Sequence, residues 1–111
     1  MPRKQGTPAF EAFVVALQAR RTEVVNGAMF GMPVIKVNGK AVAGGYDGGM
    51  IFKLDGNAHA RALSLSGSRL FDPMDKGRPM KQWVAVPSAH QPEWDALADA
   101  AIDAMIVATA S

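Results

Sequence analysis

The chain has 111 residues, of which 49% are hydrophobic and 20% are charged, a balance that fits one folded domain with its own core. It contains no cysteine, which excludes disulfides, thiolate nucleophiles, iron–sulfur clusters and cysteine-ligated zinc, and which suits a reducing cytoplasm. All 12 Lys and Arg and six of the 10 acids precede residue 89, whereas the other four acids follow it. The bases are scattered, so we interpret them as a solvated surface rather than a nucleic-acid footprint.

No targeting or membrane-spanning segment is expected. The apolar run near the start is interrupted by Glu11 and has helical spacing, which disfavours a signal peptide. No stretch approaches the roughly 18 apolar residues that a membrane span needs. We therefore expect a cytoplasmic protein.

The first element is an amphipathic helix. Thr7 and Pro8 form a start signal, a capping side chain followed by proline at the first helical position. Arg20 and Arg21 close the helix, where cations suit its dipole. The apolar residues between them recur at i, i+3, i+4 and i+7: Phe10, Phe13, Val14 and Leu17.

A β-meander follows. Asn38-Gly39 predicts a two-residue hairpin turn that pairs Val37 with Lys40 and Ile35 with Val42. At the next turn we expect a three-residue loop with Gly49 in the left-handed conformation, because a two-residue loop would place Lys53 opposite Val42. This register pairs Val42 with Leu54, Gly44 with Phe52 and Tyr46 with Met50, and it gives one apolar face made of Ile35, Val37, Val42, Phe52 and Leu54.

The remaining elements are a short helix over 58–65, a strand over 80–86 ended by Pro87, and a last helix. The last helix carries an apolar stripe of Trp94, Leu97, Ala98, Ala101 and Met105. The order α-β-β-β-β-α-β-α has no repeats or linkers. It predicts a single α+β domain over residues 1–111, with a mostly antiparallel sheet and helices packed on it.

The sheet carries apolar residues on both faces. In the strand over 80–86, Trp83 and Ala85 oppose Val84 and Val86, and Val34, Ala41, Ala43 and Ile51 likewise oppose the first apolar face. Such a sheet must be covered on both sides. Either one helix lies on the far side or a second subunit covers it. We predict a homodimer in which the face bearing Trp83, Val34 and Ile51 is the interface.

The order and spacing of several short motifs resemble the N-terminal domain of the TfoX/Sxy proteins over residues 10–106. The matching residues are Met29-Phe30-Gly31, Asn38-Gly39-Lys40, Phe52-Lys53-Leu54, Gly77-Arg78-Pro79-Met80 and Val86-Pro87. The resemblance implies a small α+β fold and a stand-alone first domain. It also implies a regulatory role connected with bacterial transcription or DNA-uptake competence. The family offers no catalytic residues to carry over.

A basic turn is the candidate ligand site. Lys76, Arg78 and Lys81 could bind a carboxylate or phosphate, with Gly77 allowing close approach. They could equally protect a strand edge from pairing with other chains. The alternative function is therefore a small-anion or small-molecule binding domain.

Catalytic and metal sites are not expected. His59 and His90 lie outside any metal-binding spacing, so we expect solvent-facing or structural roles. Asp95, Asp99 and Asp103 lie along one helix face over about 12 Å, too far apart to share one ion, and are expected to form a solvated face. We predict a non-enzymatic protein-interaction module without cofactor, metal or specific nucleic-acid partner.

Overall fold

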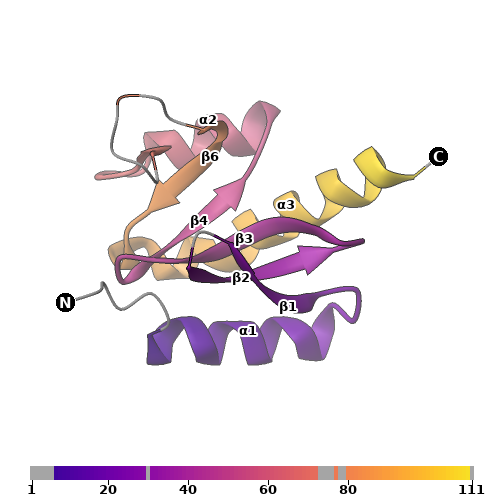
Figure 1. Cartoon of the computed structure of the whole chain (residues 1–111). Helices are drawn as coiled ribbons and strands as arrows, with labels where there is room; N and C mark the ends of the chain where they lie inside the picture. The colour runs from indigo at the N-terminus through magenta and orange to yellow at the C-terminus, as the bar shows by residue number, and fades with distance from the viewer. Residues whose placement is uncertain (1–6, 30, 73–76, 78–79, 111) are drawn as a thin grey trace.

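The computed structural model describes residues 7–29, 31–72, 77 and 80–110, and these form the expected α+β architecture (Figure 1). The elements are α1 (Pro8–Arg20), β1 (Val25–Met29), β2 (Met32–Val37), β3 (Lys40–Tyr46), β4 (Gly49–Lys53), α2 (Gly56–Ser64), β5 (Arg69–Phe71), β6 (Met80–Val86), the 3-10 helix η1 (Ser88–Glu93) and α3 (Trp94–Thr109). Helix α1 begins as predicted, because the Thr7 side chain accepts a hydrogen bond from the Phe10 amide at 3.1 Å.

The six strands form one antiparallel sheet in the spatial order β1-β2-β3-β4-β6-β5. Strands β1 to β4 follow the chain as a meander. Strand β6 then pairs with β4, and β5 takes the outer edge although it comes earlier in the sequence. The sequence did not predict this order. Strand β5 lies between the predicted helix over 58–65 and the predicted strand over 80–86, where the sequence analysis assigned no element, because three residues are too few to show a periodic pattern.

The second turn of the meander has two residues, not the three that we expected. Asp47 and Gly48 have φ values of 53° and 81°, and Tyr46 pairs directly with Gly49. The predicted pairing of Ile35 with Val42 is also wrong, because Ile35 pairs with Ala43 while Lys36 pairs with Ala41. Val42 is therefore an extra residue, a β-bulge inside β3.

This bulge explains why the predicted apolar face is right although its register is wrong. All five residues of that face belong to one buried cluster, together with Ala43, which we had placed on the opposite face. To keep these apolar side chains on one face, the chain needs one more residue between β2 and β4 than two regular two-residue hairpins would contain. That extra residue is Val42, inside β3, and not a third residue in the β3–β4 turn.

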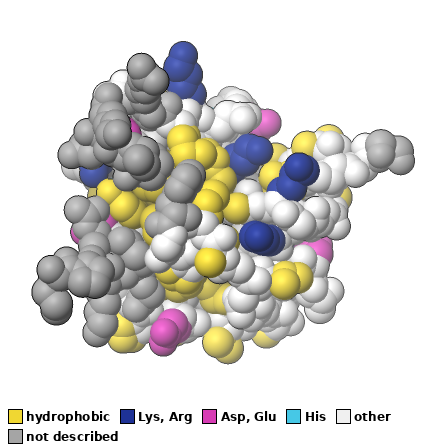
Figure 2. Space-filling model, viewed as in Figure 1, with side chains coloured by type: hydrophobic (Ala, Val, Ile, Leu, Met, Phe, Trp, Pro, Cys, Tyr) yellow, Lys and Arg dark blue, Asp and Glu magenta, His cyan; other side chains and the backbone are white. Residues whose placement is uncertain are grey.

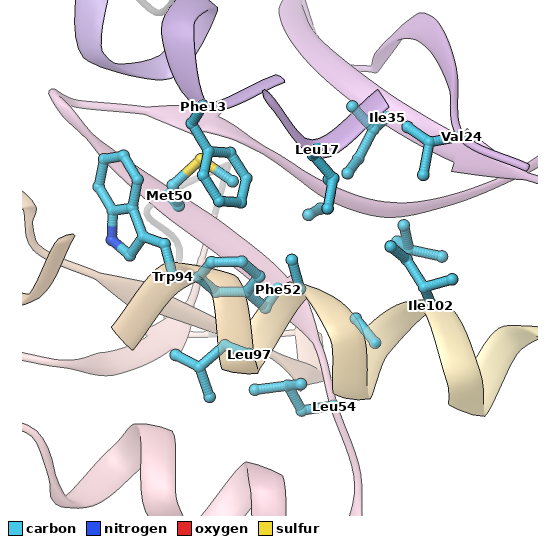
Figure 3. Packing of buried hydrophobic residues seen from close by; sticks show 14 of the residues in the cluster. Phe13, Leu17, Val24, Ile35, Met50, Phe52, Leu54, Trp94, Leu97 and Ile102 are labelled. Carbon is cyan, nitrogen blue, oxygen red and sulfur yellow. The ribbon is translucent and has the colours of Figure 1, made fainter. Parts of the chain in front are cut away.

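All three helices pack on the same face of the sheet. The large buried cluster there joins residues of α1, α2 and α3 to strand residues of that face. Figure 3 shows Phe13 of α1 and Trp94 of α3 meeting above Met50 and Phe52. The two rings form an edge-to-face pair with centroids 5.7 Å apart. The sequence left two ways to cover the far face of the sheet, a helix of the same chain or a second subunit. None of the described helices covers that face.

Candidate interaction surface

The sheet face opposite the helices has an apolar cluster of its own, which we call the open face. Its buried members are Met32, Ile51, Phe71 and Trp83, and its partly buried members are Met29, Ala41, Tyr46, Met80 and Ala85. All nine residues come from strands, so no described helix contributes to this cluster. The rings of Tyr46 and Phe71 pack edge to face at 5.0 Å. In Figure 2 the apolar side chains form a patch on the face turned toward the viewer.

The residues predicted to form the dimer interface lie together on this side of the sheet. Val34 sits beside Gly44, where an added Cβ would lie 2.8 Å from a Val34 methyl group and 3.5 Å from Ile51. Within the single chain, Trp83, Val34 and Ile51 are only 6%, 1% and 0% exposed. A partner would therefore contact the partly buried ring of residues around them, with Met29 and Met80 the most adaptable. The interface itself remains a prediction.

A row of lysines lies along one end of the open face. Lys36 pairs with Ala41, and Lys53 pairs with Trp83, so both side chains share the side of the cluster. Lys81 lies two residues before Trp83 on β6, is exposed, and lies at the same end of the sheet. Figure 2 shows Lys and Arg side chains beside the apolar patch. We call Lys36, Lys53 and Lys81 the lysine row.

Gly27 lets Lys36 lie across the edge strand. A Cβ built at Gly27 would lie 2.7 Å from the Cε atom and 2.9 Å from the Cδ atom of Lys36. The aliphatic stem of this lysine therefore crosses β1 in the space that a larger residue would fill. Its ammonium group is carried to the margin of the open face.

The predicted anion site is only partly within the described residues. Lys76 and Arg78 lie outside them, whereas Lys81 is exposed on β6. Gly77 has a positive φ of 72°, and its amide donates a hydrogen bond to the Asp72 carboxylate at 2.9 Å. The turn that was predicted to let an anion approach thus has its Gly77 amide bonded to the chain's own carboxylate.

The acidic row of α3 is paired with α1, which the sequence analysis missed. Arg20 contacts Asp99 at 2.8 Å and Asp95 at 3.1 Å, and Arg21 contacts Asp103 at 2.8 Å and Asp99 at 3.2 Å. The hydrogen bond from Arg20 to Asp99 raises the pKa of this guanidinium, and that from Arg21 to Asp103 does the same for Arg21. The row is solvent-exposed as predicted, but it also connects two helices.

A lowered pKa and one more ion pair also lie on the helix side of the sheet. The pKa of the Glu23 carboxyl is lowered by hydrogen bonding to its own backbone and to Arg21. Arg61 of α2 contacts Glu93 at 3.0 Å. Every described arginine that forms an ion pair therefore does so on the helix side of the sheet, whereas no member of the lysine row pairs with a described acid.

The two histidines each contact a backbone carbonyl of another element. His59 Nε2 lies 2.8 Å from the Lys81 oxygen, and His90 Nε2 lies 2.7 Å from the Ser66 oxygen. These contacts fit the structural role expected for both. Over the described part of the chain, no three His, Asp or Glu side chains gather as metal ligands would.

One cleft of about 220 Å³ opens at the end of the β3–β4 hairpin. Its lining mixes opposite charges, Arg69 and Asp47, with the Tyr46 side chain and the backbone around Gly49 and Gly67. This mixture gives no clear preference for a ligand of either sign.

Among the described helices, none is both long and apolar enough to cross a bilayer.

Comparisons with known proteins add no relative. No family model, no curated protein and no solved structure matches this chain. The resemblance to the TfoX/Sxy N-terminal domain therefore remains a prediction from the sequence motifs.

Proposed function

We propose that the protein is a non-enzymatic association module that binds other proteins through the open face. The observation that carries this proposal is the placement of all three helices on one side of a sheet that is apolar on both sides. Half-buried methionines at the margin of an apolar cluster are typical of adaptable protein-binding surfaces. A role in transcription or competence regulation rests on the TfoX/Sxy resemblance alone.

The proposal is tested by removing apolar character from the open face without changing its volume. In Met29→Gln/Met80→Gln, two half-buried thioethers become amides of similar size, and their partial exposure lets the amides stay hydrated. We expect affinity-purified wild type to retain proteins from a cell lysate that the double variant loses. Val15→Gln is the matched control, because Val15 is 69% exposed on α1, away from the open face.

The outcome that contradicts the proposal is equal loss of partners from both variants, or loss from neither. Mass spectrometry of the same eluates for small molecules tests the alternative function, an anion-binding domain. Retention of a phosphate or carboxylate metabolite that depends on Lys81 would favour that alternative.

The homodimer predicted from the sequence is the competing occupant of the open face. Sedimentation equilibrium at high micromolar concentration measures this directly. A homodimer through the open face would dissociate about tenfold more readily in Met29→Gln/Met80→Gln and not in Val15→Gln. Trp83→Ala is a poorer test, because truncating so buried a side chain also destabilises the monomer by about 3 kcal/mol.

A further inference from the structure

The charges around the open face distinguish one kind of partner from others. On the helix side, Arg20, Arg21 and Arg61 are all paired with carboxylates. On the open face, the lysine row has no ion-pair partner among the described residues. Among the described acids, Asp47 lies in the β3–β4 turn, Asp55 follows Lys53 by two residues, and Asp72, directly after β5, accepts the Gly77 amide. The open face therefore combines an apolar centre with lysines at one end that form no ion pair with a described residue.

From this arrangement we infer that the open face binds an acidic amphipathic segment of another protein. This inference rests on the proposed function and specifies the chemistry of the partner. The apolar side of such a segment would cover Met29, Met80 and Ala85, and its carboxylates would meet the lysine row. Opposite charge at the margin of an apolar contact speeds encounter and selects the partner.

The spacing of the lysine row suits a helix laid across the strands. Lys36 on β2 and Lys53 on β4 are two strands apart in the sheet, which is about 10 Å. Carboxylates two turns apart on a helix are separated by about 11 Å along its axis. Lys81, on β6 next to β4, extends the positive charge past Lys53. One acidic stripe along a helix would therefore face Lys36 and Lys53, with Lys81 beyond them at the same end of the sheet.

A single-stranded nucleic acid fits the same face less well. Proteins that bind single strands present aromatic rings on which bases stack. Here Phe71 and Trp83 are 1% and 6% exposed, so neither ring offers an open stacking surface, and Tyr46, the remaining ring of the cluster, is itself partly buried against Phe71. A second copy bound face to face fits less well too, because the described open-face cluster contains no carboxylate that could pair with the lysine row.

Selection from a random peptide display library against the purified chain tests the inference. We expect the enriched peptides to combine Asp and Glu with apolar residues at helical spacing. The best peptide, fluorescently labelled, is then titrated with protein variants. Lys53→Glu is expected to weaken binding about fivefold, and Lys36→Glu and Lys81→Glu by similar factors. The affinity of the wild type should fall as the salt concentration rises.

Lys40→Glu is the matched control. Lys40 pairs with Val37, whose side chain lies in the helix-side cluster, so the same charge is reversed on the other side of the sheet. We expect a change of less than about twofold, since Lys40 lies away from the bound peptide. Circular dichroism and the urea midpoint confirm that each variant is folded.

Several results would overturn the inference. These are enrichment without acidic residues, an effect of Lys40→Glu as large as that of Lys53→Glu, or tighter binding of labelled oligothymidylate than of any selected peptide. A homodimer that dissociates in Met29→Gln/Met80→Gln would also overturn it, since a second copy would then occupy the face.

If the methionine variant blocks peptide binding while the lysine reversals do not, the proposed function stands and only the acidic partner fails. If neither set of variants blocks it, both proposals fail.

Discussion

Gly49 lies where β4 passes closest to the end of β6. A Cβ built on Gly49 would collide with the Val86 carbonyl oxygen and come within 3.1 Å of the Pro87 Cα atom. Both obstacles are backbone atoms, which cannot move without disturbing the pairing of β4 with β6. Gly27 presents the opposite case, because the atoms that a Cβ would meet there belong to the flexible Lys36 side chain.

The two glycines therefore predict different costs for the same substitution. Gly49→Ala is expected to lower the free energy of unfolding by about 3 kcal/mol, since the strands must separate to admit the methyl group. Gly27→Ala should change it by less than about 1 kcal/mol, because Lys36 can move aside and the unfolded chain loses entropy. Urea denaturation of the two variants measures the difference, and equal midpoints would contradict the assignment of Gly49.

The meander also shows, residue by residue, what could and could not be predicted from the sequence. The five apolar residues predicted for the helix side of the meander follow from alternation and do lie there, whereas Ala43 was placed on the wrong face. The position of the extra residue does not follow, because a bulge at Val42 and a longer turn at Gly49 place the same five residues on that side. Only the three-dimensional pairing distinguishes the two.

At the scale of elements, α1 and α3 are joined by the ion pairs of Arg20 and Arg21 with the acidic row. Helices α1 and α3 were both predicted from their apolar stripes, and both stripes are buried. The pairing between them could not be predicted, because residues 20 and 99 are far apart in the sequence. Two adjacent arginines and three aspartates at i, i+4 and i+8 were the available signal.

Asp99 is shared by both arginines, so its removal tests this connection. Asp99→Ala is expected to cost about 1 kcal/mol at low salt, a modest value because the carboxylate is partly exposed and screened by water. The cost should shrink in 1 M salt, where the Debye length is about 3 Å. A double-mutant cycle with Arg20→Ala isolates the interaction between Arg20 and Asp99. A coupling free energy that does not change with salt concentration would exclude an ionic origin.

At the scale of the whole molecule, the fold class and the apolar character of both sheet faces were predictable from periodicity. The position of β6 beside β4, and hence the joining of Trp83 to Ile51, Phe71 and Met32, was not. The open face depends on this long-range pairing, which no local pattern encodes. The lysine row was missed for the same reason: Lys36, Lys53 and Lys81 come from three separate strands.

The strand order also has a consequence for how the chain folds. Strands β1 to β4 are joined by tight turns and can pair while the rest of the chain is still unfolded, whereas β6 must close a long loop to reach β4. We expect the meander to form the folding nucleus and β6 to dock late. Stopped-flow kinetics should show that Gly39→Ala, in the β2–β3 turn at a φ of 81°, mainly slows folding. Val84→Ala, in β6, should mainly speed unfolding, and the reverse pattern would place the nucleus at the β4–β6 pair. If the meander forms first and β6 docks late, the open face is the last part of the molecule to assemble, after the helix-side core has begun to close.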